Sequence, residues 1–166
     1  KDILGANSAG IYAYHYTNLF QINDKYTNFS TFKELHTFFI YIHNELTNLK
    51  NISRFCGERF DLVQAGGGNT SVKLNNLMFI KASGYNLSNI TLDKGYVCIN
   101  NKKLLRDLSN NELNSKITFY NMYGNLRGSI ETYMHSILKK YTIHLHPIQV
   151  NKILILKNSK NIIKKL

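Results

Sequence analysis

The sequence predicts an α/β domain in which helices alternate with short β-strands. Apolar residues recur at spacings of three and four across residues 31–49, which is typical of one face of a helix. Short runs typical of strands follow at 70–74 and 77–82, each bounded by turn residues. At 166 residues and 43% hydrophobic content, the chain is long enough for one domain with a single core. Layered packing of helices on strands is therefore expected.

The first helix is preceded by sequence of a different kind. Residues 1–30 are polar and aromatic with poor periodicity, and we interpret them as a connector or an extended arm. The domain itself is predicted to span residues 31–166. Thr31 and Glu34 form a capping box at its start. A shorter segment at 55–62 then leads into a glycine-rich loop.

Turn residues separate the strands that follow. Asn75 and Asn76 suit a tight hairpin between the first two strands, because asparagine tolerates a positive φ. Another short strand is predicted at 96–99. The polar stretch 100–116 is expected to form a loop with a helical turn, and 117–120 to form a strand.

The C-terminal part is predicted to form a helix, a strand and a last helix. Ser129 can cap the first of these helices, which runs to about residue 139, and residues 141–145 have the pattern of a strand. Pro147 stands at the favoured first position of the last helix. That helix carries Val150 and Ile153 and then gives way to lysine-rich polar sequence.

The large positive net charge is weak evidence for an anionic partner. Lys and Arg number 21 against 10 Asp and Glu, a net charge of +11 that can indicate nucleic acid or an anionic membrane. The lysines are scattered, however, and no strand interleaves aromatic with basic residues. We therefore attribute the charge to the codon bias of an AT-rich genome, and predict no nucleic acid partner.

Two further features bear on where the protein works. No apolar run reaches about 18 residues, so the sequence predicts no membrane-spanning helix and no membrane partner. Two cysteines, Cys56 and Cys98, are too few for a disulfide framework. We expect a reducing, cytoplasmic compartment.

Two glycine-containing loops could bind an anion. Residues 66–71 (GGGNTS) combine consecutive glycines, which let backbone N–H groups approach a phosphate, with the side-chain donors of Asn69, Thr70 and Ser71. The spacing fits neither a P-loop nor a dinucleotide fingerprint, and a flexible turn is the alternative. Ser83 and Gly84 could supply a second set of donors.

Two later motifs carry acid–base and metal-binding residue types. Ser129 and the first turn of the predicted helix could hold an anion, and Glu131 and His135 share one helix face, where a hydrogen-bonded pair is the default. His144 and His146 lie at i and i+2 on a predicted strand, so both imidazoles point to one side and suit zinc. Coincidence is the alternative for this last pair.

Over roughly residues 55–155, the four motifs in this order resemble those of the class II aldolase/adducin family. The forms GGGNTS and SIET resemble most closely the sugar-phosphate aldolase branch that includes bifunctional rhamnulose-phosphate aldolase/dehydrogenases. The resemblance implies a three-layer α/β/α sandwich with a central, mostly antiparallel sheet. It also implies a homo-oligomer, commonly a tetramer.

The resemblance implies a role for eight residues. A sugar phosphate is expected to bind at a set of loop residues: Gly68, Asn69, Ser83, Gly84 and Ser129. Glu131 is expected to be the catalytic acid and base, and His144 and His146 to be zinc ligands. Zinc would stabilise the enediolate that forms when a C–C bond of a ketose phosphate is cleaved or made. Epimerisation of a pentulose phosphate, or a non-catalytic adducin-like interaction module, are the alternatives.

The sequence departs from the family pattern in two places. Ile130 stands where the family often has a second hydroxyl residue, which weakens one phosphate contact or indicates a different substrate group. The family's third zinc histidine lies several tens of residues beyond the His-x-His pair, and no histidine follows His146 here. Together with the start at Lys1, this leads us to expect a fold that is incomplete at its C-terminus, and an inactive fragment is a further alternative.

Overall fold

The computed structural model describes residues 32–122 and 124–165. The predicted arm at 1–30 and the Thr31 end of the predicted capping box lie outside the described residues. The chain divides into two compact units, Lys1–Phe39 and Ile40–Leu166. All the packing described below belongs to the second unit.

The first described element, helix α3 (Phe32–Gly57), is longer than the sequence predicts. Apolar periodicity indicates a helix only as far as residue 49, but the helix continues for two more turns and includes the start of the segment assigned separately to 55–62. Gly57 ends it where the backbone approaches the short 3₁₀ helix η1 (Leu87–Asn89). A Cβ at Gly57 would lie 2.3 Å from the Ser88 nitrogen, so only glycine permits this approach.

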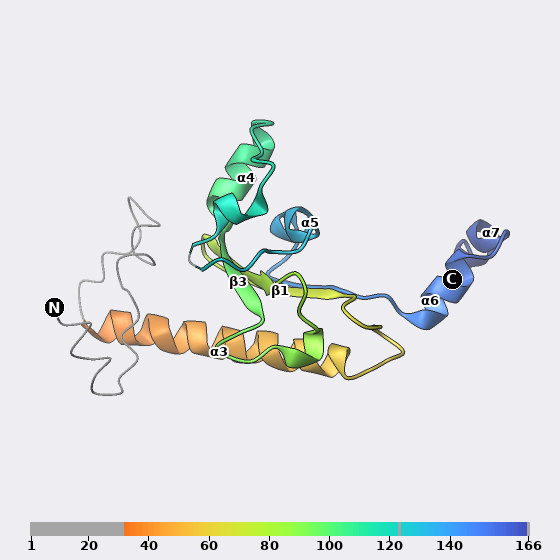
Figure 1. The fold of residues 1–166 in the computed structure, drawn as a ribbon, viewed down its shortest axis with the longest axis horizontal. Coiled ribbons are helices and arrows are strands. Elements are labelled where there is room, and N and C mark those ends of the chain that lie inside the picture. Colours follow the sequence, from red (N-terminus) through yellow and green to blue (C-terminus); the bar gives the residue numbers. More distant parts are fainter. Residues whose placement is uncertain (1–31, 123, 166) are drawn as a thin grey trace. The chain divides into compact units, whose positions relative to one another are not determined.

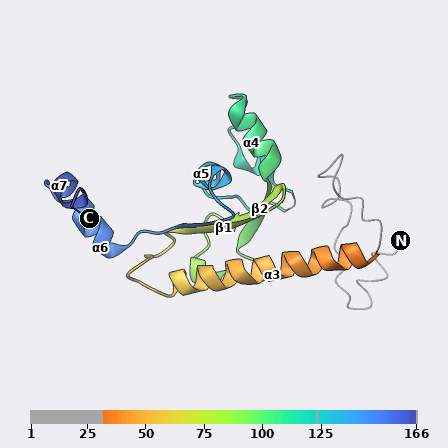
Figure 2. The same cartoon turned by 180° about the vertical axis from the view of Figure 1, so that it is seen from behind.

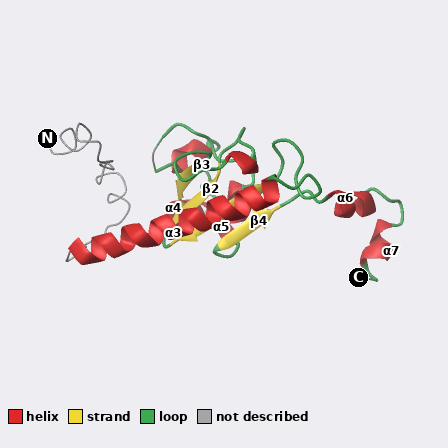
Figure 3. Ribbon diagram, turned by 90° about the horizontal axis from the view of Figure 1, so that it is seen from below, coloured by secondary structure: helices red, strands yellow, loops and turns green. Residues whose placement is uncertain are grey.

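Four strands form one antiparallel sheet, shown in yellow in Figure 3. They are β1 (Asn69–Leu74), β2 (Leu77–Lys81), β3 (Tyr96–Asn100) and β4 (Tyr141–His144), in the order β3-β2-β1-β4. The hairpin predicted between β1 and β2 is confirmed: Leu74 pairs with Leu77, and Asn75 has a φ of 51°. The predicted α/β class and the antiparallel sheet are thus confirmed.

Helices contact both faces of this sheet (Figures 1 and 2). On one face, Met78 and Ile80 of β2 belong to a core cluster with Leu104 of helix α4 (Asn101–Ser109). On the other face, the Ser53 hydroxyl of α3 lies 2.7 Å from that of Thr70 on β1. The alternation of side chains along each strand produces this division. A complete three-layer sandwich stays a prediction.

Two predictions between β3 and the third motif are wrong. Residues 101–109 form the regular helix α4 rather than a loop with one turn, and the Asn100 side chain caps it by accepting from the Lys103 N–H. Residues 117–120 form the 3₁₀ helix η2 (Ile117–Tyr120) rather than a strand. Ile117 and Tyr120 are both buried, and a 3₁₀ turn places residues three apart on one side.

Helix α5 (Thr132–Ile137) is shorter than predicted and begins later. Ser129 does not cap it, because Gly128 forms an extended bridge with Ala82 and the chain turns only after that point. At the other end, the Lys73 ammonium donates to the carbonyls of Leu138 and Lys139. A cation that satisfies the last carbonyls in this way is a common helix stop.

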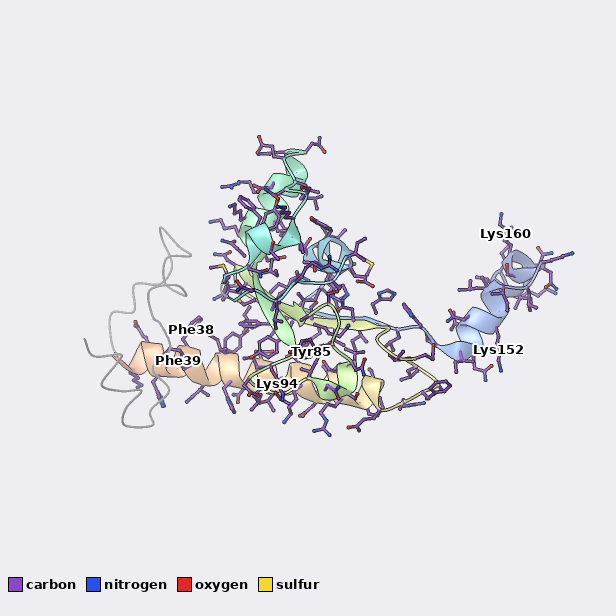
Figure 4. All side chains as sticks on the ribbon, viewed as in Figure 1. Phe38, Phe39, Tyr85, Lys94, Lys152 and Lys160 are labelled. Atoms are coloured by element: carbon purple, nitrogen blue, oxygen red, sulfur yellow. The ribbon has the colours of Figure 1, made fainter. Side chains whose placement is uncertain are left out.

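The last described elements are the short helices α6 (Ile148–Leu154) and α7 (Ser159–Ile163). Pro147 precedes α6 as its N-cap residue rather than occupying the first helical position. Within the described part of the chain, neither helix buries a residue. Lys152 on α6 and Lys160 on α7 are exposed (Figure 4).

Two predictions concern the whole chain. In the described ranges 32–122 and 124–165, no helix has the length and apolar character needed to cross a membrane. Cys56 and Cys98 are free and buried. Burial raises the pKa of both thiols, which keeps them protonated.

Candidate functional site

The first, third and fourth motifs meet at the end of the β1–β4 ladder. Asn69 of β1 pairs with His144 of β4, so the two motifs lie side by side across the sheet. The Asn69 amide donates a hydrogen bond to the Ser129 hydroxyl, from the loop before α5. Asn69 and Ser129 are both buried. Strand pairing therefore places the asparagine of the glycine-rich loop, the serine and one histidine in one location.

The second motif joins this group through the segment before α5. The Ala82–Gly128 bridge aligns the two loops, and the Ser83 N–H donates to the Arg127 carbonyl at 2.7 Å. The Arg127 guanidinium in turn donates to the Ser83 hydroxyl at 3.3 Å. All four motifs that the sequence singled out are thus connected by backbone or side-chain contacts.

Glu131 interacts with both the Ser129 hydroxyl and His144. Its Oε1 lies 3.8 Å from Nδ1 of His144, which is an ion-pair distance. Partial burial on its own would raise the pKa of Glu131, but hydrogen bonds from Ser129, the backbone and Asn69, together with the charge of His144, bring the pKa below its usual value. The carboxylate is therefore ionised at neutral pH and can accept a proton.

The rings of His144 and His146 lie next to each other, although β4 ends at His144, one residue before the end of the predicted strand, and His146 lies outside it. Their ring centroids lie 4.9 Å apart in an edge-to-face arrangement. His144 Nδ1 is buried and has no hydrogen-bond partner within the described residues, so it has an unused site for a proton or a ligand. A Cβ at Gly67 would lie 3.0 Å from His146 Nδ1, so the glycine-rich loop packs directly against this ring.

The donor set fits part of a zinc site. Two imidazoles, with the Glu131 carboxylate nearby, are the ligand types that zinc prefers. A catalytic zinc usually has three protein ligands, and the described residues hold no group of three His, Cys, Asp or Glu arranged to bind a metal. Among the described residues at this site, His144 and His146 are the two imidazoles that could serve as ligands.

The two glycines of the predicted phosphate loops have different environments. Gly68 has a φ of +71° and is buried, and a Cβ there would lie 3.0 Å from Val63 and 3.1 Å from the His144 carbonyl. Gly84 has a φ of +84°, and no atom lies within 4 Å of its Cβ position. Both positions require a backbone conformation that favours glycine, but only Gly68 is also closely packed.

Sequence reasoning missed Lys81. This lysine ends β2 and is 3% exposed, and its ammonium donates to the Tyr85 carbonyl at 2.9 Å and to the Gly66 carbonyl at 3.4 Å. Burial lowers its pKa, and the charge of Glu131 opposes part of that change. It therefore ties the two glycine loops together with a positive charge. A lone lysine in the buried strand LMFIK was the signal.

Sequence reasoning also missed the partner of His135. The expected side-chain pair between Glu131 and His135 does not form; only the His135 backbone N–H donates to the Glu131 carbonyl. The His135 ring instead contacts the Ser71 hydroxyl, Nδ1 to Oγ, at 2.8 Å. His135 is fully buried, and burial lowers its pKa to about 4. No sequence pattern pairs residues 64 positions apart.

Comparison with known proteins bears on the fold of this chain. No family model and no curated protein matches the chain. Among solved structures, it matches the N-terminal class II aldolase domain of a conserved protein from Thermoplasma acidophilum, with a TM-score of 0.56 and 25% sequence identity. The chain resembles a class II aldolase domain. The match covers 66% of this chain and 58% of the Thermoplasma chain, so the class II aldolase likeness spans less than two thirds of that protein.

Proposed function

We propose that this chain carries the substrate-binding and metal-binding residues of a zinc-dependent class II aldolase that acts on a ketose phosphate. The observation that carries the proposal is the convergence of four separate motifs: Asn69 contacts Ser129, Ser83 contacts Arg127, and Glu131 faces His144. The similarity to a class II aldolase domain supports the same conclusion. Within that family, we propose the sugar-phosphate branch.

The phosphate is proposed to bind between the two glycine loops. Gly84 leaves the backbone of the second loop open, and Ser83 provides a hydroxyl donor. Gly68 and Ser129 are proposed to shape the first side of the site, where the Ser129 hydroxyl already donates to Glu131. Lys81 donates to the Gly66 carbonyl of the first loop and to the Tyr85 carbonyl beside the second, and adds a buried positive charge. Fixed backbone and hydroxyl donors with a nearby cation favour a bound anion, because their geometry needs no rearrangement.

His144 and His146 are proposed to hold zinc. When bound, the ion would act as a Lewis acid for the negative charge that develops on the oxygens of the sugar. Two observations support this assignment: His144 Nδ1 makes no hydrogen bond among the described residues and has only Glu131 near it, at 3.8 Å, and His146 packs against Gly67.

Glu131 is proposed to move the proton. Cleavage breaks a C–C bond: the hydroxyl proton leaves as its carbon becomes an aldehyde, and the bonding electrons pass to the other fragment as an enediolate, which then gains a proton on carbon. An ionised carboxylate can accept the first proton and return one to the enediolate. The lowered pKa of Glu131 keeps it in the accepting form at neutral pH.

The proposal is tested by metal analysis and a cleavage assay on the same protein. Purified protein is expected to contain zinc and to release a triose phosphate from at least one ketose phosphate in a panel of pentulose and hexulose phosphates. Glu131→Gln is expected to retain zinc and lose cleavage. Glu58→Gln, at an exposed carboxylate that pairs with Arg54, is the matched control. Protein that binds no zinc and cleaves nothing would contradict the proposal.

Assembly and compartment complete the proposal. We propose a cytoplasmic homo-oligomer, a tetramer by family resemblance, with no nucleic acid partner. Ile130 is 86% exposed beside the buried Ser129, and an apolar side chain so close to the site is compatible with a subunit contact there. Light scattering of the purified protein is expected to give a mass several times 19.2 kDa.

A further inference from the structure

Arg127 differs from the other arginines in having no carboxylate partner among the described residues. The sequence contains four arginines. Three of them pair with a carboxylate close by in the sequence: Arg54 with Glu58 at 3.0 Å, Arg59 with Asp61 at 2.7 Å and Arg106 with Asp107 at 3.1 Å. No carboxylate of the described residues lies within 4.0 Å of Arg127. Its charge is therefore not neutralised by this part of the protein.

Arg127 is held at the second glycine loop by contacts on both sides. Its carbonyl accepts the Ser83 N–H at 2.7 Å, next to the bridge between Ala82 and Gly128. Its Nη2 donates to the Ser83 hydroxyl at 3.3 Å. The backbone bridge and the side-chain contact together place the guanidinium beside the loop where the phosphate is proposed to bind.

The chemistry of this pair suits a doubly charged oxyanion. A guanidinium has five N–H donors, and the contact with Ser83 uses one of them, so the others can form two parallel bonds to a phosphate. Because the Ser83 oxygen accepts from Arg127, its own O–H is free to donate to the same phosphate. A carboxylate or an uncharged hydroxyl offers fewer acceptor oxygens and less charge.

We propose that Arg127 is a specificity-determining residue that makes this site select a phosphate monoester over singly charged and uncharged analogues. The inference rests on the proposed function, since it assumes that the loops of Gly68 and Ser83 bind the substrate's anionic end. Beyond the proposed function, the inference assigns recognition of the phosphate's double negative charge to Arg127. Arg127 is exposed, so its guanidinium is accessible to a ligand from solution.

The test is titration calorimetry with inorganic phosphate and, separately, acetate, at low salt and about pH 8, where phosphate is mainly a dianion. Arg127→Gln is expected to weaken phosphate binding by about 10- to 100-fold, the range for charge-assisted hydrogen bonds, and to change acetate binding much less. Arg127→Lys keeps the charge but loses the planar guanidinium, and its phosphate affinity is expected to lie between those of the unmodified protein and Arg127→Gln. Arg54→Gln is the matched control and should bind phosphate within about twofold of the unmodified protein.

The outcomes separate this inference from the proposed function. If Ser83→Ala weakens phosphate binding while Arg127→Gln and Arg127→Lys leave it unchanged, the role of Arg127 is wrong and the phosphate site stands. If the unmodified protein shows no saturable phosphate binding, the phosphate site and the role of Arg127 both fail. Equal weakening of phosphate and acetate binding by Arg127→Gln would also overturn the inference, because it would show general charge attraction without selection.

Discussion

The Ser71 hydroxyl on β1 lies 2.8 Å from Nδ1 of His135 on α5, and both side chains are buried. This contact joins the strand that carries Asn69 to the helix that begins after Glu131. Asn69 is two residues before Ser71, and Glu131 is about one helical turn before His135. This buried hydrogen bond, which lies outside the proposed substrate contacts, therefore helps to fix the position of α5 relative to β1, together with the Asn69–Ser129 contact.

Removing the Ser71 hydroxyl is expected to destabilise the fold. Ser71→Ala leaves a buried ring nitrogen without a partner, which costs about 1–3 kcal/mol of the free energy of unfolding. Urea unfolding followed by circular dichroism measures this change. Ser115→Ala, at an exposed serine, is the control and is expected to stay within about 0.5 kcal/mol. Equal stability of the two variants would show that the Ser71–His135 contact contributes nothing.

Burial of His135 predicts an acid-dependent loss of stability. Its pKa falls from 6.5 to about 4 on folding, so below about pH 6.5 the unfolded chain binds a proton that the folded chain excludes. Lys73 and His144 face the ring and favour its neutral form, whereas Glu131 opposes them. Stability from His135 is thus full above pH 6.5 and is lost as the pH falls towards 4.

Urea unfolding at about pH 7 and about pH 5 tests this dependence. The unmodified protein is expected to lose on the order of 2 kcal/mol more than His135→Gln between these two values. The carboxylates with lowered pKa, including Glu45 and Glu131, have ordinary values of 4.5 or less, so their contributions change mainly at lower pH. Parallel curves for the two proteins would contradict a buried neutral His135.

Local sequence signals predicted the elements whose residues act locally. Asn75 supplies the positive φ of the hairpin, and the i, i+2 spacing of His144 and His146 places their rings next to each other. These outcomes depend on backbone geometry that each short segment determines by itself. The family resemblance added the expectation that distant motifs meet, and contacts such as Asn69 to Ser129 agree with it.

Tertiary contacts explain what the sequence did not show. Residues 117–120 have a β-branched and aromatic composition, but burial of both Ile117 and Tyr120 favours a 3₁₀ turn. The roles of Lys81 and His135 depend on partners that only the fold brings near, the Gly66 and Tyr85 carbonyls and the Ser71 hydroxyl. Composition and periodicity describe one segment at a time and do not contain such pairs.

The two positive-φ glycines of the proposed phosphate loops are expected to differ in their tolerance of alanine. Gly84→Ala meets no atom within 4 Å and bears only backbone strain, about 1–2 kcal/mol. Gly68→Ala adds contacts near 3.0 Å with Val63 and the His144 carbonyl, and is expected to lose about 2–4 kcal/mol in total. Thermal and urea unfolding rank the two variants. A larger loss for Gly84→Ala would show that close packing at Gly68 is absent.

Glu45 joins α3 to β4 and is expected to matter more for stability than Glu58, an exposed glutamate directly after the same helix. Its carboxylate accepts the Lys140 ammonium at 2.6 Å and the Tyr141 hydroxyl, and the side chain is buried. Glu45→Gln is expected to cost about 1–2 kcal/mol of the free energy of unfolding, because both donors lose a charged acceptor. Glu58→Gln breaks only an exposed pair with Arg54 and should cost less than about 0.5 kcal/mol. Equal losses of unfolding free energy in the two variants would show that the buried contacts of Glu45 contribute no more to stability than an exposed ion pair.

Zinc binding is expected to depend on His144 and not on His43, an exposed histidine of α3. His144→Ala removes one of two imidazole ligands, and zinc affinity should fall by at least about tenfold, since even residues that only orient a ligand have effects of that size. His43→Ala should bind zinc as the unmodified protein does. Metal content after dialysis against limiting zinc measures the difference in affinity. Added zinc should also raise the thermal midpoint of the unmodified protein and of His43→Ala more than that of His144→Ala, because a ligand that binds the folded state stabilises it. Equal zinc content in both variants would place the ion elsewhere and contradict the proposed role of His144, whose Nδ1 makes no hydrogen bond among the described residues.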